Sequence, residues 1–138
     1  MWDFSDVYKK DQFAVSYLTL HEWFYKKQKH RTLTSFMEKL GYKKIALYSL
    51  GTLGSIFLNE FLNENIDILY AVDKNKQLFP DSINGVPIIA PDEIEKQQQV
   101  DVIVVCHVYY YNQIADEIAK HGIPEERIIS LNDIVFSV

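Results

Sequence analysis

A glycine-containing turn carries the clearest chemistry in this sequence. Residues 48–54 read Tyr-Ser-Leu-Gly-Thr-Leu-Gly, close to the dinucleotide-binding pattern Gly-x-Gly-x-x-Gly. Gly51 and Gly54 hold the second and third glycine positions, and Ser49 replaces the first. The second glycine lets a phosphate reach the backbone, and the third lets a helix pack closely on a sheet. The pattern predicts a phosphate-binding turn in which the Ser49 hydroxyl lies within reach of the phosphate.

A nucleotide bound at this turn would contact the N-terminus of the following helix and the end of the second strand. A helix that begins at Thr52 presents the N–H groups of Thr52 and Leu53 to an anion, together with the positive end of its dipole. Asp73 follows Gly51 by 22 residues, where an acid that binds a ribose hydroxyl is expected. We therefore hypothesise an anionic nucleotide over the start of this helix, with its ribose on Asp73 and Lys74 beside it. The alternative is that the glycines only shape a tight turn and that Asp73 caps a loop.

A second group of polar and aromatic residues follows a very apolar run, at residues 106–111. His107 is of the residue type most often used for acid–base chemistry, and Tyr109 offers a ring for stacking on a base or sugar. The alternative is that Cys106 is a small buried hydrophobe and that the tyrosines only cap the sheet edge. We expect His107 and Tyr109 to bind ligand rather than to catalyse, and we assign no catalytic residue. With a single cysteine in the chain, no metal site is expected.

Short apolar runs alternate with amphipathic stretches along residues 43–131. This alternation predicts an α/β fold, because right-handed crossovers between such strands produce a parallel sheet that is covered on both faces. The turn after the first strand then favours a Rossmann-like five-stranded sheet in the order 3-2-1-4-5. Residues 74–85 are expected to form a loop, and the last residues a turn. The expected strands are residues 45–48, 66–72, 86–89, 100–106 and 127–131.

The first 40 residues predict helices, which we treat as a helical extension (1–40) of the Rossmann-like domain (41–138). Apolar residues recur there at helical spacing, but they spread wider than one stripe. We hypothesise that one face packs on the domain and that the other meets a second copy or a partner protein. The alternative is a monomer in which the helices satisfy each other. The large apolar residues are Trp2, Phe4, Phe13, Tyr17, Leu18, Leu20, Trp23 and Phe24, of which Phe13, Tyr17, Leu20 and Phe24 lie on one line at helical spacing, with Leu18 and Trp23 off it.

Composition narrows the class of protein. The 138 residues fit one domain and carry a net charge of −5, which argues against nucleic acid as a partner. The sequence has no apolar run long enough to span a bilayer, and its acidic N-terminus does not have the plan of a signal peptide. We therefore expect a cytoplasmic protein with no membrane insertion and no nucleic acid partner.

Several segments resemble small Rossmann-like domains that occur with bacterial surface-polysaccharide enzymes. The similarity covers about residues 31–138. Similar domains sit at the N-terminus of sugar acetyltransferases and nucleotide-sugar dehydratases, and beside glycosyltransferases. The resemblance implies a nucleotide or nucleotide-sugar binding module of polysaccharide biosynthesis, a fragment or accessory of a glycosyltransferase, with NAD(P) or a nucleotide-sugar as ligand. The segments read GYKKIALYSLGTLG (41–54), VDKN (72–75), GVPII (85–89), DVIVV (101–105) and IISLNDI (128–134).

The same residues are also consistent with two other functions. One is a minimal NAD-dependent sugar-modifying enzyme that uses His107 and a tyrosine. The other is a structural or interaction module whose pocket is vestigial. We favour a non-catalytic binding domain, because a fold of this kind does not by itself imply a reaction.

Overall fold

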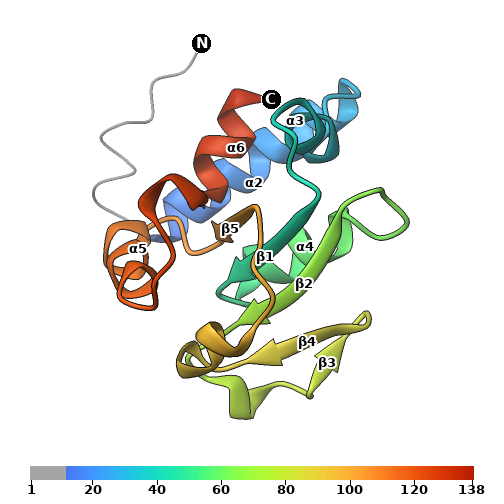
Figure 1. Cartoon of the computed structure of the whole chain (residues 1–138). Helices are drawn as coiled ribbons and strands as arrows, with labels where there is room; N and C mark the ends of the chain where they lie inside the picture. The colour runs from blue at the N-terminus through green and yellow to red at the C-terminus, as the bar shows by residue number, and fades with distance from the viewer. Residues whose placement is uncertain (1–11) are drawn as a thin grey trace.

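The computed structural model describes residues 12–138, and a sheet forms the central layer of this part of the chain (Figure 1). Its six strands lie in the order β3-β4-β2-β1-β5-β6. Five of them are parallel, and β3 pairs antiparallel with β4 at the edge. The predicted order of the five parallel strands is therefore confirmed. The strands are β1 (Lys44–Tyr48), β2 (Asp67–Val72), β3 (Ser82–Ile83), β4 (Val86–Ile89), β5 (Val102–Val105) and β6 (Ile128–Ser130).

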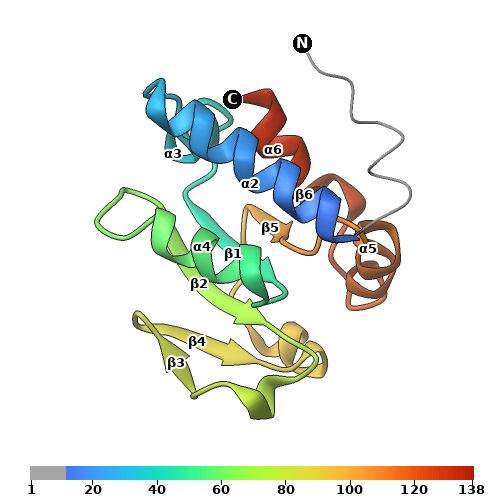
Figure 2. The ribbon, with the colours of Figure 1, turned by 180° about the vertical axis from the view of Figure 1, so that it is seen from behind.

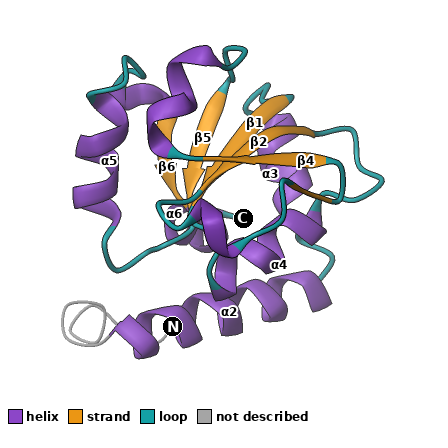
Figure 3. Cartoon of the chain, turned by 90° about the horizontal axis from the view of Figure 1, so that it is seen from below, coloured by secondary structure: helices purple, strands orange, loops and turns teal. Residues whose placement is uncertain are grey.

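Helices cover both faces of the sheet. Side chains of α2, α3, α4 and α6 share one core with one face, whereas α5 and η2 pack on the other. Figure 3 shows α2 and α4 together along one side of the sheet. Within the described chain, no helix combines the length and the hydropathy needed to cross a bilayer. The α-helices are α2 (Gln12–Gln28), α3 (Leu33–Lys39), α4 (Thr52–Glu60), α5 (Tyr111–Ala119) and α6 (Leu131–Ser137), and the 3₁₀ helices are η1 (Lys76–Leu78), η2 (Pro91–Lys96) and η3 (Glu125–Arg127).

Alternation along β1 explains why the sheet is buried on both faces. Ile45 and Leu47 belong to the core under α2, α3, α4 and α6. Ala46 and Tyr48 belong to the core under α5. A strand with both faces buried reads as a continuous apolar run, which is how this strand was recognised in the sequence.

Two expectations about the connections are wrong. The stretch 74–85 contains η1 and the short strand β3, and the last residues form the helix α6 instead of a turn. Ser130 begins α6 by accepting a hydrogen bond from the Asn132 N–H at 3.2 Å. Leu131 and Ile134 are then buried one turn apart. A helix of seven residues is too short to be stable alone, so its packing on α2 determines the outcome.

The apolar line at helical spacing is not the buried face of α2. Phe13, Tyr17 and Phe24 are exposed, and Leu20 is only partly buried. The buried stripe instead consists of Val15, Thr19, Trp23 and Lys26. Trp2 and Phe4 lie outside the described residues.

Two polar groups on the buried stripe of α2 are satisfied internally, which makes their burial tolerable. The Thr19 hydroxyl donates to the Val15 carbonyl at 2.8 Å. The Lys26 ammonium donates to the Val135 carbonyl of α6, also at 2.8 Å. Figures 1 and 2 both show α2 running alongside α6. Trp23 packs in the same hydrophobic core as Ile45 and Leu47 of β1. The division of the chain into two domains at residue 40 stays a prediction.

A carboxylate joins the starts of β1 and β5. Asp101 Oδ2 accepts hydrogen bonds from the N–H groups of Lys43 at 2.8 Å and Lys44 at 2.9 Å. The Asp101 N–H donates to the Lys44 carbonyl at 2.7 Å. The hydrogen bond from Lys44, followed by that from Lys43, lowers the pKa of the Asp101 carboxyl below its usual value.

We predict that Asp101→Asn lowers stability in a pH-dependent way. Because the folded-state pKa is depressed, the ionised carboxylate stabilises the fold above its unfolded pKa of about 4, and this contribution is lost as the pH falls through the folded pKa. Urea unfolding of parent and variant should therefore differ at neutral pH and converge in acid. Glu126→Gln, at an exposed position in η3, is the matched control. A difference that stays constant down to about pH 3 would contradict the prediction.

Candidate nucleotide-binding site

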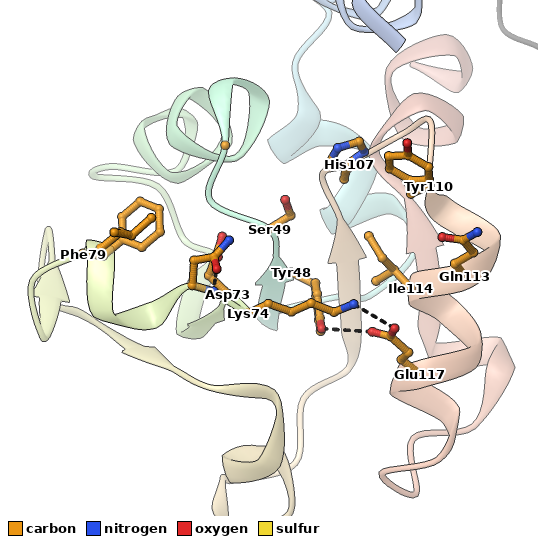
Figure 4. Close-up of a pocket in the computed structure, with 13 residues that line it drawn as sticks. Tyr48, Ser49, Asp73, Lys74, Phe79, His107, Tyr110, Gln113, Ile114 and Glu117 are labelled. Carbon is orange, nitrogen blue, oxygen red and sulfur yellow. Dashed lines mark hydrogen bonds and ion pairs between the residues drawn. The ribbon is translucent and has the colours of Figure 1, made fainter. Parts of the chain in front are cut away.

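A pocket of about 400 Å³ opens where β1, β2 and β5 end (Figure 4). The carboxyl ends of parallel strands are where open α/β sheets bind ligands. Of the nine residues predicted to bind a cofactor, five line this pocket: Ser49, Gly51, Asp73, Lys74 and His107. The rest of its wall consists of Tyr48, Asn75, Leu78, Phe79, Tyr110, Gln113, Ile114 and Glu117.

Ser49 takes the backbone conformation of the glycine that it replaces. Its φ of +83° lies in the left-handed region that favours glycine. Its N–H donates to the Val72 carbonyl of β2 at 2.7 Å, so pairing with the neighbouring strand maintains this conformation. A non-glycine residue in this region is strained, and such strain is often retained at functional sites.

The two glycines of the turn have different structural roles. At Gly54, an added Cβ would lie 2.0 Å from the Ser49 carbonyl oxygen, which no packing can accommodate. At Gly51, an added Cβ meets nothing within 4 Å, and the φ is −62°. Gly54 is therefore required by the fold, whereas Gly51 leaves open space above the backbone for a ligand.

Asp73 connects β2 to the turn. The carboxylate is buried, and its Oδ2 accepts the Leu50 N–H at 2.8 Å. Its Oδ1 accepts the Asn75 N–H, also at 2.8 Å. An ionised carboxylate has about four acceptor positions, so both oxygens keep capacity for ribose hydroxyls. The side chain is thus held rigidly at the edge of the pocket.

The first turn of α4 lies directly after Gly51, its N-cap. Thr52 is exposed, whereas Leu53 has its side chain in the core, so only its backbone is suited to ligand contact. The N–H groups of a first helical turn have no carbonyl partner within the helix. Ser55 donates its hydroxyl to the carbonyls of Leu50 and Gly51, which fixes the turn from the other side.

Three polar side chains from three elements meet along the pocket wall (Figure 4). Lys74 Nζ lies 2.8 Å from Glu117 Oε1, and the Tyr48 hydroxyl donates to Glu117 Oε2 at 3.4 Å. Burial, followed by the charge of Glu117, raises the pKa of Tyr48 well above its usual value. Tyr48 is therefore a neutral donor at physiological pH.

The residues after β5 form an aromatic group. The His107 and Tyr110 rings are 5.0 Å apart, and the Tyr110 and Tyr109 rings are 4.9 Å apart. Tyr110 lines the pocket, whereas Tyr109 meets the Tyr110 ring edge to face and is not among the residues that line the pocket. Cys106 is fully enclosed, and burial raises the pKa of its thiol, as expected for a structural cysteine.

Several wall residues were not identified from the sequence. Leu78 and Phe79 belong to the stretch around η1 that was expected to be a plain loop. Glu117 lies on α5, one turn beyond Gln113. The spacing of Tyr110, Gln113 and Glu117 is that of one helix face, which is a usable signal once the pocket is assigned to the end of β5.

These features define a Rossmann-like α/β domain with a pocket at the carboxyl edge of its parallel sheet. A protein-family model described as "C2185-like, N-terminal" matches residues 41–129, more than half of the chain. The chain therefore belongs to the C2185-like, N-terminal family.

Among individual proteins, the chain is similar in sequence to a transcriptional repressor. The chain is 35% identical over 85 residues to the redox-sensing transcriptional repressor Rex of an Exiguobacterium species (strain AT1b). The match covers 57% of this chain but 39% of that protein, so the chain spans well under half the length of this relative.

Two solved structures share the fold. The crystal structure of RSP, a Rex-family repressor, gives a TM-score of 0.52 at 18% identity and covers 80% of this chain and 64% of that one. RSP in complex with β-NAD⁺ and operator DNA gives a TM-score of 0.50 at 18% identity, over 75% and 59% of the two chains. At this identity the likeness establishes the fold alone.

These comparisons overturn the expected context. The assignment to surface-polysaccharide biosynthesis and glycosyltransferases is wrong, because the curated relative is a transcriptional repressor. The expectation of no nucleic acid partner is contradicted as well, because the relative that is 35% identical is a transcriptional repressor and RSP has been solved with operator DNA. Of the expected ligands, NAD agrees with the β-NAD⁺ of that complex, and a nucleotide-sugar has no support.

The physical reason for these errors lies in the motifs themselves. The stretches that carried the resemblance are four strands of the sheet, the end of β2, the turn between β1 and α4 and the start of α6. A Rossmann-like domain needs them to fold, whatever process it serves. The net charge of −5 is a sum over the chain and does not describe how charge is distributed over a surface that binds a partner.

We predict opposite effects for the two glycines of the turn. Gly51→Val should keep the fold, because the added side chain meets open space, but should abolish nucleotide binding by blocking the phosphate. Gly54→Ala should destabilise the fold by about 3 kcal/mol through the clash with the Ser49 carbonyl. Urea unfolding and calorimetric titration with NADH measure the two effects separately. Equal NADH affinity in Gly51→Val and the parent would place the site elsewhere.

Replacing Ser49 by glycine tests whether strain is retained for binding. Because φ is +83°, Ser49→Gly should raise the free energy of unfolding by about 1 kcal/mol. It should also weaken nucleotide binding, because a hydroxyl that lines the pocket is removed. Ser35→Gly, at an exposed position within α3 that does not line the pocket, is the control and should only destabilise. Stronger binding by Ser49→Gly would show that the hydroxyl takes no part.

Proposed function

We propose that this chain is an NAD(H)-binding domain of a redox-responsive transcriptional regulator. The observation that carries the proposal is the buried Asp73 carboxylate, held at the end of β2 by the backbone of the β1–α4 turn. In dinucleotide-binding folds an acid at this position binds the ribose, and the turn binds the pyrophosphate.

The described residues fit an adenine dinucleotide. The adenosine ribose would lie on Asp73, and the pyrophosphate over Gly51 and the first turn of α4, where a Cβ meets open space. Phe79 and Ile114 line the pocket from two elements, which suits a planar base between apolar walls. The bound dinucleotide would supply the redox state that the domain reads, and the chain would supply the positioning.

The regulatory role is supported by the Rex relative rather than by the pocket. At 35% identity over 85 residues, that relative is named a redox-sensing transcriptional repressor. In this chain the basic stretch 26–31 is partly engaged internally, since Lys26 contacts the Val135 carbonyl and Lys27 pairs with Glu60. We therefore place the DNA contacts of such a regulator outside this stretch.

The test is a set of calorimetric titrations with NADH, NAD⁺ and UDP-glucose. We expect NADH and NAD⁺ to bind at the same site with dissociation constants that differ by about tenfold or more, because a sensor responds only to a difference in affinity. ADP-ribose should compete with both. UDP-glucose, which lacks adenine, should not bind.

Each outcome bears on a separate part of the proposal. Absence of binding by both NADH and NAD⁺ would refute the assignment of the site. Equal affinities would remove the sensing role and leave the binding role. Gly51→Val is the matched control, because it should remove binding without unfolding the chain.

A further inference from the structure

The ammonium group of Lys74, next to the proposed ribose site, is paired with a carboxylate of another element. Lys74 directly follows Asp73, and its ammonium lies 2.8 Å from Glu117 on α5 (Figure 4). Glu117 in turn accepts a hydrogen bond from Tyr48 at the end of β1. The strand β1, the loop after β2 and the helix α5 thus fix one carboxylate and, through it, the position of one lysine.

The position of Lys74 has a chemical meaning in a dinucleotide site. An acid at the end of β2 binds the 2′-hydroxyl of the adenosine ribose, whereas a cation nearby accommodates the 2′-phosphate of NADP(H). This chain carries both groups side by side, Asp73 and Lys74. Without a competing partner, the ammonium would be available to a 2′-phosphate.

We propose that Glu117 sets a preference for NAD(H) over NADP(H) by sequestering the Lys74 ammonium. The inference rests on the proposed nucleotide site. Glu117 neutralises the cation that directly follows the ribose acid, and Asp73 then faces a 2′-phosphate as an uncompensated negative charge. Glu117 is a positioning residue in this scheme, because it acts through Lys74.

An ion pair of this kind could instead serve stability alone. The Lys74 side chain is 58% exposed, and pairs this exposed contribute little to stability. A structural role would weaken both dinucleotides together. A selectivity role changes the ratio of their affinities, which is the quantity to measure.

The experiment compares NAD⁺ and NADP⁺ binding in the parent and Glu117→Gln. Glutamine can still accept the Tyr48 hydroxyl, but it no longer binds Lys74 as an ion pair. We expect the affinity for NADP⁺ relative to NAD⁺ to rise by about tenfold, the scale of one charge-assisted contact. The double variant Lys74→Gln/Glu117→Gln should lose this gain, because the gain requires the ammonium.

The matched control is the second ion pair of the same loop. Lys76 lies 2.9 Å from Glu93, and among the described residues the pocket wall does not include Lys76. Glu93→Gln should leave the NADP⁺ to NAD⁺ ratio unchanged. An unchanged ratio in Glu117→Gln, or a gain that survives loss of Lys74, would overturn the inference. A parent that binds neither dinucleotide would refute the proposed function instead.

Discussion

The close approach of Gly54 to the Ser49 carbonyl is the constraint on which the rest of this structure depends. An added Cβ would lie 2.0 Å from that oxygen, so α4 can leave β1 at this angle only without a side chain there. This angle places the start of α4 at the carboxyl edge of the sheet. It also brings the Leu50 N–H to the carboxylate of Asp73, at 2.8 Å. Fold and site therefore share one short segment of backbone.

Asp73 connects this constraint to ligand chemistry. Its two oxygens already organise the turn after β1 and the loop after β2, through the N–H groups of Leu50 and Asn75. A ribose hydroxyl that binds the same carboxylate would meet an acceptor whose position is already fixed. Such preorganisation reduces the entropy lost on binding. It also means that a substitution of Asp73 disturbs the turn as well as the contact, so the glycine variants separate fold from binding more cleanly.

The fold was predictable wherever the pattern depends on local periodicity. The apolar runs at β1, β2, β4, β5 and β6 identify strands buried on both faces, and the handedness of crossovers then sets their order. The sequence did not predict the buried face of α2 or the helix α6, because tertiary contacts determine both. In α2, Trp23 and Lys26 face inward because the Val135 carbonyl of α6 satisfies the lysine, a contact 109 residues away. The helix α6 itself is too short for propensity to reveal it.

The candidate site divides in the same way. Gly51, Gly54 and Asp73 follow from the spacing that a phosphate turn and a ribose acid require, whereas Glu117 comes from a helix more than sixty residues beyond β1 and shows its relevance only through Lys74 and Tyr48. Biological context was further out of reach, because strand ends and turns are common to sugar enzymes and to repressors. Here an acid, a cation and a second acid follow one another from β2 to α5. Lys74 pairs with Glu117, and the Asp73 carboxylate accepts backbone N–H groups instead, so the charge beside Asp73 depends on a residue of α5.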